Sequence, residues 1–287
     1  MRKSTLLAAS ALAALPLAGA ASAAGLAGGA TTTPAAACAK ANAAAFHTKG
    51  KLTIATDNPA YTPWFVNNKP ANGKGYESAV AYAVANQLGF TAKQVTWAYE
   101  PFDNSYQPGA KPFDFDINEI SVTPDRAAVV SFSNSYYDVT QSIVTLKTDA
   151  IVKHHSPADL KKYVYGDQLG TTGYQYILNH LKPTQSVHVY NTLDDAVNAL
   201  LAKQIDAIVV DTPDGQYMAS GQIPSNKGTQ IGQFPSTGEH YGLLFSKGSA
   251  LVGCVNSALS TLSANGTLTK LQKQYLGIYN KVPTIQP

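Results

Sequence analysis

The chain contains the run Phe113-Asp114-Phe115-Asp116-Ile117-Asn118-Glu119-Ile120-Ser121-Val122-Thr123-Pro124-Asp125-Arg126, whose pattern decides the fold. In its first half apolar residues alternate with Asp114, Asp116 and Asn118, which predicts a β-strand with one apolar face. Thr123-Pro124-Asp125 then predicts the N-cap and first turn of a helix. A strand that passes directly into a helix is the repeating unit of an α/β fold.

Arg126 is the most informative residue of this run. The chain has one other arginine, Arg2, which lies in a segment that we predict is removed. A lysine is a point charge, whereas the planar guanidinium of an arginine can hold a carboxylate with two parallel hydrogen bonds. We therefore interpret Arg126 as a candidate carboxylate ligand. The alternative is an ordinary surface residue or an ion-pair partner at the start of a helix.

The N-terminus has the pattern of a secretory signal peptide. Arg2 and Lys3 form a basic start, the apolar run Leu6 to Ala20 is short for a membrane span, and Ala21-Ser22-Ala23 is a small-residue cleavage site. We predict a signal peptide over residues 1–23 and an exported protein, periplasmic or extracellular. Residues 24–45 are rich in Ala, Gly and Thr without a hydrophobic pattern, which predicts a disordered tether.

The composition argues against several functional classes. The formal net charge of +3 falls by two, to +1, when Arg2 and Lys3 are removed. The lysines are scattered, which argues against a nucleic-acid partner. No histidine stands at metal-ligand spacing with a second ligand, and no dinucleotide, phosphate-binding or nucleophile-elbow motif occurs. We expect no metal, no cofactor and no catalytic residue.

The chain has two cysteines, Cys38 and Cys254. An even number of cysteines in an exported protein favours a disulfide. Such a bond would join the start of the exported chain to the C-terminal helix that contains Cys254. The alternative is lipidation of Cys38, because Ala35-Ala36-Ala37-Cys38 faintly resembles a lipoprotein cleavage site, which would anchor the protein at the cell surface.

Strand and helix patterns alternate along most of the chain. This order predicts an α/β fold with mostly parallel sheets flanked by helices. The clearest strand patterns are 51–56, 94–98, 113–117, 141–146, 187–190 and 205–211, and the clearest helix patterns are 77–88, 174–181, 193–202, 250–262 and 268–275.

Polar residues stand where several of these strands end, at the edge of the sheet where ligands bind in open α/β folds. They are Asp57, Ser121, Arg126, Thr171, Thr172 and Asp211. An arginine, a helix start with free N–H groups and a separate carboxylate suit a ligand that carries both a carboxylate and an ammonium group. The alternative for Asp211, Thr171 and Thr172 is that they are only helix caps.

Taken together, these segments resemble the type II periplasmic amino-acid-binding proteins of ABC importers, solute-binding protein family 3. The resemblance covers nearly the whole chain from Lys51 to Tyr275. The matching pieces occur in family order: Thr56-Asp57 with Tyr61, Pro63 and Trp64; Gly75-Tyr76-Glu77; Ser121 to Arg126; Phe132-Ser133 with Tyr136-Tyr137; Gly170-Thr171-Thr172; Ile205 to Pro213; Tyr241-Gly242; and Asn265-Gly266-Thr267-Leu268.

The resemblance implies two lobes joined by two crossing strands, with the ligand in the cleft between them. The first lobe would comprise residues 46–141 and 241–287, and the second lobe residues 142–240. The implied partners are a free amino acid and the membrane permease of an ABC importer, and we expect a monomer.

The family's binding roles carry over to matching positions. Arg126 and Ser121 would hold the α-carboxylate with help from the amide and hydroxyl of Thr172, and Asp211 would accept from the α-ammonium. The remaining positions would surround the ligand's side chain, with walls from Tyr61, Trp64 and Phe102, Asp57 at the distal end and Asn118 near the mouth.

Glu119 departs from the family pattern, because many relatives have a small residue two positions before the serine. Together with Asp57 and Asp211 it would make the cleft electronegative, which favours a basic or polar amino acid. Glu119 could instead accept the ammonium with help from Asp211, or point away toward a lysine. Two further alternatives are a cyclohexadienyl dehydratase-like enzyme with Glu119 as general acid, and a secreted sensor module.

Overall fold

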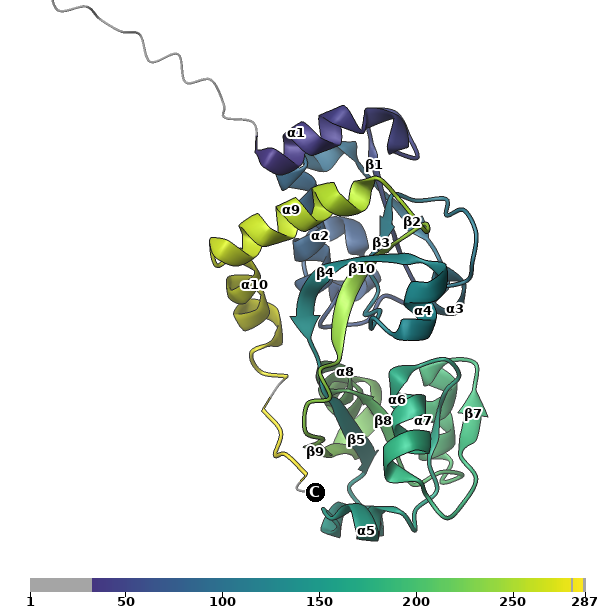
Figure 1. Cartoon of the computed structure of the whole chain (residues 1–287). Helices are drawn as coiled ribbons and strands as arrows, with labels where there is room; N and C mark the ends of the chain where they lie inside the picture. The colour runs from purple at the N-terminus through teal and green to yellow at the C-terminus, as the bar shows by residue number, and fades with distance from the viewer. Residues whose placement is uncertain (1–32, 280, 286–287) are drawn as a thin grey trace, which may run out of the picture. The chain divides into compact units, whose positions relative to one another are not determined.

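The computed structural model describes residues 33–279 and 281–285 (Figure 1). The predicted signal peptide, residues 1–23, and the first part of the predicted tether, residues 24–32, lie outside the described residues. The described chain forms two α/β lobes, each built around its own sheet. No helix in the described part of the chain is long and apolar enough to cross a membrane.

The first lobe contains a five-stranded sheet in the order β2-β1-β3-β10-β4. The strands β2, β1 and β3 are parallel, whereas β10 runs antiparallel to both β3 and β4. Their bounds are β1 Leu52–Thr56, β2 Val95–Tyr99, β3 Phe115–Asp116, β4 Ser131–Asp138 and β10 His240–Phe245.

The predicted strand at residues 113–117 is reduced to β3, which occupies the centre of this sheet. Its polar positions do not face solvent, since Asp114, Asp116 and Asn118 are all buried. Asp114 accepts hydrogen bonds from the backbone N–H groups of His47 and Thr53, both at 2.6 Å. A central strand covered on both faces buries both sets of side chains, so alternation alone could not identify an exposed face.

The second lobe contains a three-stranded sheet, β8-β5-β9, and a two-stranded sheet, β6-β7. The pair β6-β7 is parallel, but β5 runs antiparallel to both of its neighbours. The prediction of mostly parallel sheets is therefore wrong, because the chain crosses between lobes along strands that run in opposite directions. The bounds are β5 Gln141–Leu146, β6 Gly166–Gln168, β7 His188–Tyr190, β8 Ile208–Asp211 and β9 Gly228–Gln233.

Helices flank these sheets (Figure 1). Those of the first lobe are α1 Pro34–Ala41, α2 Tyr76–Gln87, α3 Phe102–Ser105, α4 Pro124–Val129, α9 Leu251–Ala264 and α10 Thr267–Leu276. Those of the second lobe are α5 Pro157–Leu160, α6 Thr172–Tyr176, α7 Leu193–Leu201 and α8 Thr212–Tyr217, where α6 and α8 continue as π-helical turns at Ile177–Leu181 and Met218–Gln222.

Each lobe has its own apolar core. In the first lobe α2 and α9 pack with the fully buried rings of Trp64, Tyr76 and Tyr241. In the second lobe neighbouring residues of β5 contribute to separate clusters, with Ile143 in one and Val144 in the other. Successive side chains of a strand point to opposite faces, so β5 divides two small cores.

Three segments pass between the lobes. The chain crosses from β4 to β5 through Val139-Thr140, and from β9 back to β10 through residues 234–239. In addition, the backbone N–H of Ile285 donates to Gln233 O at 2.7 Å, and the Ile285 side chain is buried in a core of the second lobe. The assignment of the whole segment 241–287 to the first lobe is therefore wrong at this C-terminal stretch.

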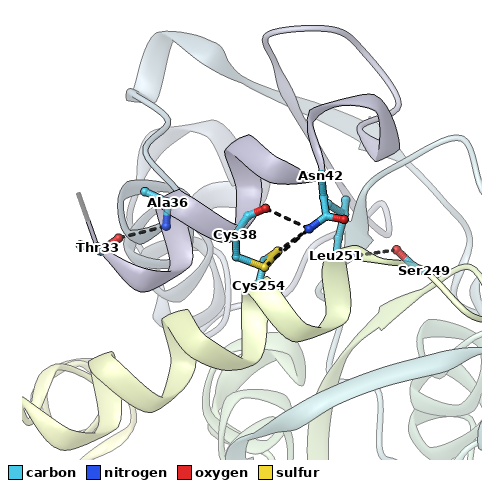
Figure 2. Close-up of a disulfide and its surroundings, with 7 residues drawn as sticks. All are labelled: Thr33, Ala36, Cys38, Asn42, Ser249, Leu251 and Cys254. Atoms are coloured by element: carbon cyan, nitrogen blue, oxygen red, sulfur yellow. Dashed lines mark hydrogen bonds between the residues drawn. A yellow bond between two sulfur atoms is a disulfide. The ribbon is translucent and has the colours of Figure 1, made fainter.

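The predicted tether is also partly wrong, because it becomes helix α1 at Pro34. Thr33 caps this helix by accepting from Ala36 N at 3.1 Å. Figure 2 shows α1 beside α9, joined by the disulfide Cys38–Cys254 with a Cα–Cα distance of 5.3 Å. The buried alanines Ala35 and Ala39 allow this close approach. The lipidation alternative for Cys38 is wrong, because its sulfur is already bonded.

Candidate functional site

A cavity of about 80 Å³ lies between the two lobes. In the first lobe it is lined by the loop after β1, the start of α3, the residues after β3, and α4. In the second lobe it is lined by β6, the start of α6, α7, the end of β8, and α8. The lining residues are Asp57, Pro59, Tyr61, Phe102, Asn118, Glu119, Arg126, Asp167, Gln168, Thr171, Thr172, Gly173, Leu193, Val209, Val210, Asp211 and Asp214.

Every predicted binding residue lines this cavity except Trp64 and Ser121. Trp64 is fully buried behind the cavity wall and its indole Nε1 donates to Asp214 at 2.6 Å. The Ser121 hydroxyl donates to Glu239 at 2.6 Å. Neither of these two side chains is therefore in position to contact a ligand in the cavity as the structure stands.

Arg126 lines the cavity from the first turn of α4, which Thr123 caps as predicted. Its guanidinium donates to Ser121 O and to Gly170 O, each at 2.8 Å, and lies 4.5 Å from the centre of the Tyr106 ring. It forms no salt bridge with a carboxylate among the described residues. Burial lowers the pKa of this guanidinium. A guanidinium has more N–H donors than these two bonds use, so it can still bind a carboxylate.

Asp211 lies at the end of β8, between the lobes. One carboxylate oxygen accepts from the Gln141 side-chain amide and the other from the Tyr241 hydroxyl. Asp211 occupies the N-cap position of α8, as the helix-cap alternative expected, but its carboxyl group makes no capping bond to that helix. Burial, and then the charges of Glu239 and Asp214, raise the pKa of Asp211 well above its ordinary value.

The two threonines at the start of α6 differ. The Thr171 hydroxyl accepts from Tyr174 N at 3.1 Å, so the cap alternative is confirmed for Thr171, although this residue also lines the cavity. The Thr172 hydroxyl accepts from the Gln141 amide at 3.2 Å. Gly173 must be glycine here, because a Cβ would lie 2.0 Å from Val209 O.

Glu119 faces the cavity from a backbone position with φ of +54°. Its backbone N–H donates to the buried carboxyl group of Glu77 at 2.7 Å, and its own carboxyl group lines the same cavity as that of Asp214. No lysine among the described residues forms a salt bridge with it, contrary to one of the alternatives for Glu119. Burial and neighbouring carboxylates raise its pKa well above the ordinary value.

The cavity is strongly acidic. The carboxyl groups that line it belong to Asp57, Glu119, Asp167, Asp211 and Asp214, whereas Arg126 is the one basic residue among its lining residues. Burial is the largest cause of the raised pKa of each, and it brings the pKa of Asp214 to about 7. Uncompensated carboxylates in a buried site favour either protons or a cationic ligand.

Several contacts join the lobes around the cavity. Tyr61 donates to Asp194 at 3.1 Å, Trp64 donates to Asp214, and Arg126 donates to the carbonyl of Gly170. Each pairs a residue of the first lobe with one of the second. The described conformation is therefore closed around a small volume.

The sequence analysis missed two acids of the cavity, Asp167 and Asp214. A signal for Asp214 existed, since it lies three residues after Asp211 with Pro213 between them, and a helix starting there puts both acids at one end. No comparable signal marks Asp167, which lies between Gly166 and Gln168 in the short strand β6.

Comparisons with known proteins agree with this architecture. The model of the bacterial extracellular solute-binding proteins, family 3, matches residues 52–278. The L-arginine-binding protein of Pseudomonas aeruginosa is 28% identical over 238 residues, which cover 78% of this chain and 90% of that protein. A structure of an ancestral arginine-binding protein bound to glutamine aligns with a TM-score of 0.66 at 26% identity, covering 80% of this chain and 100% of that one. An ancestral amino-acid-binding protein described as a precursor of cyclohexadienyl dehydratase aligns with a TM-score of 0.63 at 25% identity, covering 79% and 95%.

Proposed function

Because the chain belongs to the bacterial extracellular solute-binding proteins of family 3, we propose that it captures a free amino acid between its lobes and delivers it to the permease of an ABC importer. The exported protein would act as a monomer in the periplasm or at the outer face of the cell, after removal of residues 1–23.

One observation carries the proposal: Arg126 and Asp211, opposite in charge and 85 positions apart in the sequence, line the same cavity. A free amino acid is the small molecule that presents a carboxylate and an ammonium on one carbon. The carboxylate would bind the Arg126 guanidinium, and the ammonium would donate to Asp211. Charge-assisted hydrogen bonds of about 1.5–3 kcal/mol each would together supply the roughly 8 kcal/mol of micromolar binding.

A basic amino acid fits the charge of this cavity better than a neutral or acidic one. The carboxyl groups of Asp57, Glu119 and Asp214 exceed what an α-ammonium group could neutralise. The named relative that binds L-arginine supports the same class. We therefore place L-arginine and L-lysine ahead of L-histidine and L-glutamine.

Capture would proceed by closure of the lobes about their connecting segments. The amino acid would first bind Arg126 on the first lobe. Closure would then bring Asp211 and the start of α6 onto it and form the bonds from Tyr61 to Asp194 and from Trp64 to Asp214. A cavity of about 80 Å³ is smaller than the roughly 300–1,000 Å³ of ordinary ligand sites, so the lobes or lining side chains must shift to admit a whole amino acid.

An enzymatic role is not favoured. The named relatives are binding proteins, and the one whose description mentions cyclohexadienyl dehydratase is itself an ancestral amino-acid-binding protein. An absorbance assay with prephenate and arogenate tests this second candidate directly, and turnover of either compound would establish it.

The proposed function can be tested by a thermal-shift screen of the common amino acids, followed by titration calorimetry of those that stabilise the protein. We expect L-arginine or L-lysine to give the largest shift. Arg126→Ala should abolish the shift, whereas Lys162→Ala, an exposed lysine of the second lobe, should leave it unchanged. If no amino acid stabilises the native protein, amino-acid capture is wrong and the sensor alternative, with a degenerate cleft, gains weight.

A further inference from the structure

Glu239 lies on the second of the two segments by which the chain crosses between the central sheets of the lobes, and it does not line the cavity. Its carboxylate nevertheless accepts a hydrogen bond from the Ser121 hydroxyl at 2.6 Å. We propose that Glu239 is an internal competitor of the ligand's carboxylate, because an amino acid can gain the Ser121 hydroxyl only by displacing Glu239 from it. The inference rests on the proposed function, since it concerns how the same ligand is bound.

The competition follows from the chemistry of a hydroxyl group. A serine hydroxyl has one hydrogen, so it donates one hydrogen bond at a time. The family resemblance expects this hydrogen to go to the ligand's α-carboxylate, whereas in the described conformation it goes to Glu239, which is also a carboxylate. Two carboxylates next to one donor repel each other. The ligand and Glu239 are therefore alternative partners of Ser121.

Ser121 lies directly beside the predicted carboxylate ligand of the cavity. The Arg126 guanidinium, which lines the cavity, donates to the backbone oxygen of Ser121 at 2.8 Å. A carboxylate bound to Arg126 would therefore arrive beside the residue whose hydroxyl is bonded to Glu239. The negative charge of Glu239 also acts on the cavity, since burial and next the charge of Glu239 raise the pKa of Asp211.

Backbone pairing holds Ser121 and Glu239 together. Ser121 forms an isolated antiparallel bridge to Tyr241, and the backbone N–H of Val122 donates to His240 O at 2.9 Å. Glu239 comes immediately before His240 in the chain. The Ser121 side is 1% exposed, whereas Glu239 is half-buried. The donor is thus fixed in the first lobe, and the longer, partly exposed acid is the partner that can move.

Glu239 keeps a hydrogen-bond donor when it leaves Ser121. Its second carboxylate oxygen accepts from the side-chain amide of Gln141 at 3.0 Å, and the same amide donates to Asp211 at the end of β8. The backbone oxygen of Glu239 accepts from Val139 N at 3.0 Å, which joins the two crossing segments. Displacement therefore does not leave the charge of Glu239 without a partner. It takes place on a segment about which the lobes are proposed to turn, so carboxylate binding and lobe movement act on the same side chain.

The test compares two amino acids with their decarboxylated forms by titration calorimetry, L-arginine with agmatine and L-lysine with cadaverine. Each pair has the same cationic groups and differs by the α-carboxylate. Glu239→Gln removes the competing charge and weakens the bond from Ser121, because hydrogen bonds to charged acceptors are the stronger ones. We expect it to raise the affinity for arginine and lysine about five- to tenfold without raising the affinity for agmatine or cadaverine.

A double-mutant cycle separates competition from a purely structural role of Glu239. In the native protein Ser121→Ala removes a donor that the ligand must first win from Glu239, so arginine affinity should change by less than about threefold. In the Glu239→Ala background the same substitution removes an available donor, and arginine affinity should fall by roughly 10- to 100-fold. Glu239→Ala also serves as the second variant if Glu239→Gln is unstable.

Asp138→Asn is the matched control. Asp138 ends β4 opposite His240, and its exposed carboxylate accepts from the Ser135 hydroxyl at 3.1 Å. It is thus an acid bonded to a serine at the same junction, but neither residue of this pair lines the cavity. The substitution should change neither the affinity for the amino acids nor their preference over the decarboxylated forms.

The outcomes separate this inference from the proposed function. If both Glu239 variants leave arginine and lysine binding unchanged or weaker, or if Ser121→Ala has equal effects in both backgrounds, the competition is wrong and amino-acid capture stands. Failure of both arginine and lysine to bind the native protein would also overturn the competition. Failure of every common amino acid would overturn the proposed function as well.

Discussion

At one end of the cavity the Arg126 guanidinium keeps its charge against two backbone carbonyls, those of Ser121 and Gly170, and the ring of Tyr106. At the other end burial raises the pKa of both Glu119 and Asp214. The difference follows from chemistry. A guanidinium remains charged when buried because carbonyl dipoles can solvate it, whereas clustered carboxylates reduce their mutual repulsion by taking up protons. The Arg126 end can therefore bind an anion at any ordinary pH, whereas the charge of the end that contains Glu119 and Asp214 changes with pH.

Arg126→Ala should have the largest effect, because it removes the charge that defines the first end. We expect a loss of about 3–5 kcal/mol in amino-acid binding, measured by titration calorimetry. Arg126→Lys, which keeps the charge but not the planar fork, should recover only part of this loss. Near-normal binding by Arg126→Ala would show that Arg126 does not bind the carboxylate of the ligand.

The stability of the ligand-free protein should fall as pH rises. Burial holds the pKa of Glu77 at about 8 and that of Asp214 at about 7, above their ordinary values. The folded state therefore keeps protons that the unfolded state loses, and this stabilisation disappears as pH rises through the folded-state pKa values. We expect the free energy of unfolding by urea to decrease by about 2–4 kcal/mol between pH 5 and pH 7.

A variant at a buried acid outside the cavity shows whether the pH dependence of stability arises from the acids of the cavity or from buried acids throughout the fold. Asp116 is fully buried in β3, does not line the cavity, and also has a pKa raised by burial. Asp116→Asn should flatten part of the pH dependence of stability without changing amino-acid affinity. Stability that increases from pH 5 to pH 7 would contradict the protonation of these acids.

Asp211→Asn should have a smaller effect, because the amide can still accept from Tyr241 and so preserves part of the local hydrogen bonding. Loss of the charge opposite the ligand ammonium should cost about 1.5–3 kcal/mol of affinity in the same calorimetric titration. An unchanged affinity would show that Glu119, and not Asp211, accepts from the α-ammonium, which was one of the alternatives from the sequence.

Tyr61→Phe should have the smallest effect. It removes the bond from Tyr61 to Asp194 between the lobes, but Asp194 still accepts from the Gln222 amide and is not left unpaired. We expect affinity to weaken by about 0.5–1.5 kcal/mol. Tyr82→Phe, which removes a similar bond to Ala71 O within the first lobe, is the control and should leave affinity unchanged. Equal effects of the two variants would argue against closure through Tyr61.

The sequence predicted the features that depend on local chemistry. Thr123 and Pro124 form the N-cap and first turn of α4, and Asp211 is conspicuous as an acid at the end of an apolar strand. The family resemblance then placed Arg126 and Asp211 in one cleft, and both line the cavity. The roles assigned to them there remain predictions.

Prediction from the sequence failed where the position of a side chain or a helix depends on residues far away in the chain. The Ser121 hydroxyl bonds to Glu239, which lies 118 positions later, and the Trp64 indole bonds to Asp214, and neither Ser121 nor Trp64 lines the cavity. Helix α1 has the same Thr-Pro start at Thr33-Pro34, but the alanine-rich run after it shows no hydrophobic pattern, and the helix packs against α9 and is bonded to it through Cys254. Such contacts become visible only when the chain is folded.

The two ends of the described chain are fastened to different lobes. Helix α1 is covalently tied to α9 of the first lobe, and Ile285 is inserted into the second. Two fluorophores, one attached at exposed Lys40 and the other at exposed Lys281, would therefore be attached to different lobes. Energy transfer between them would report the distance between the two lobes, and so would measure directly the closure that we propose.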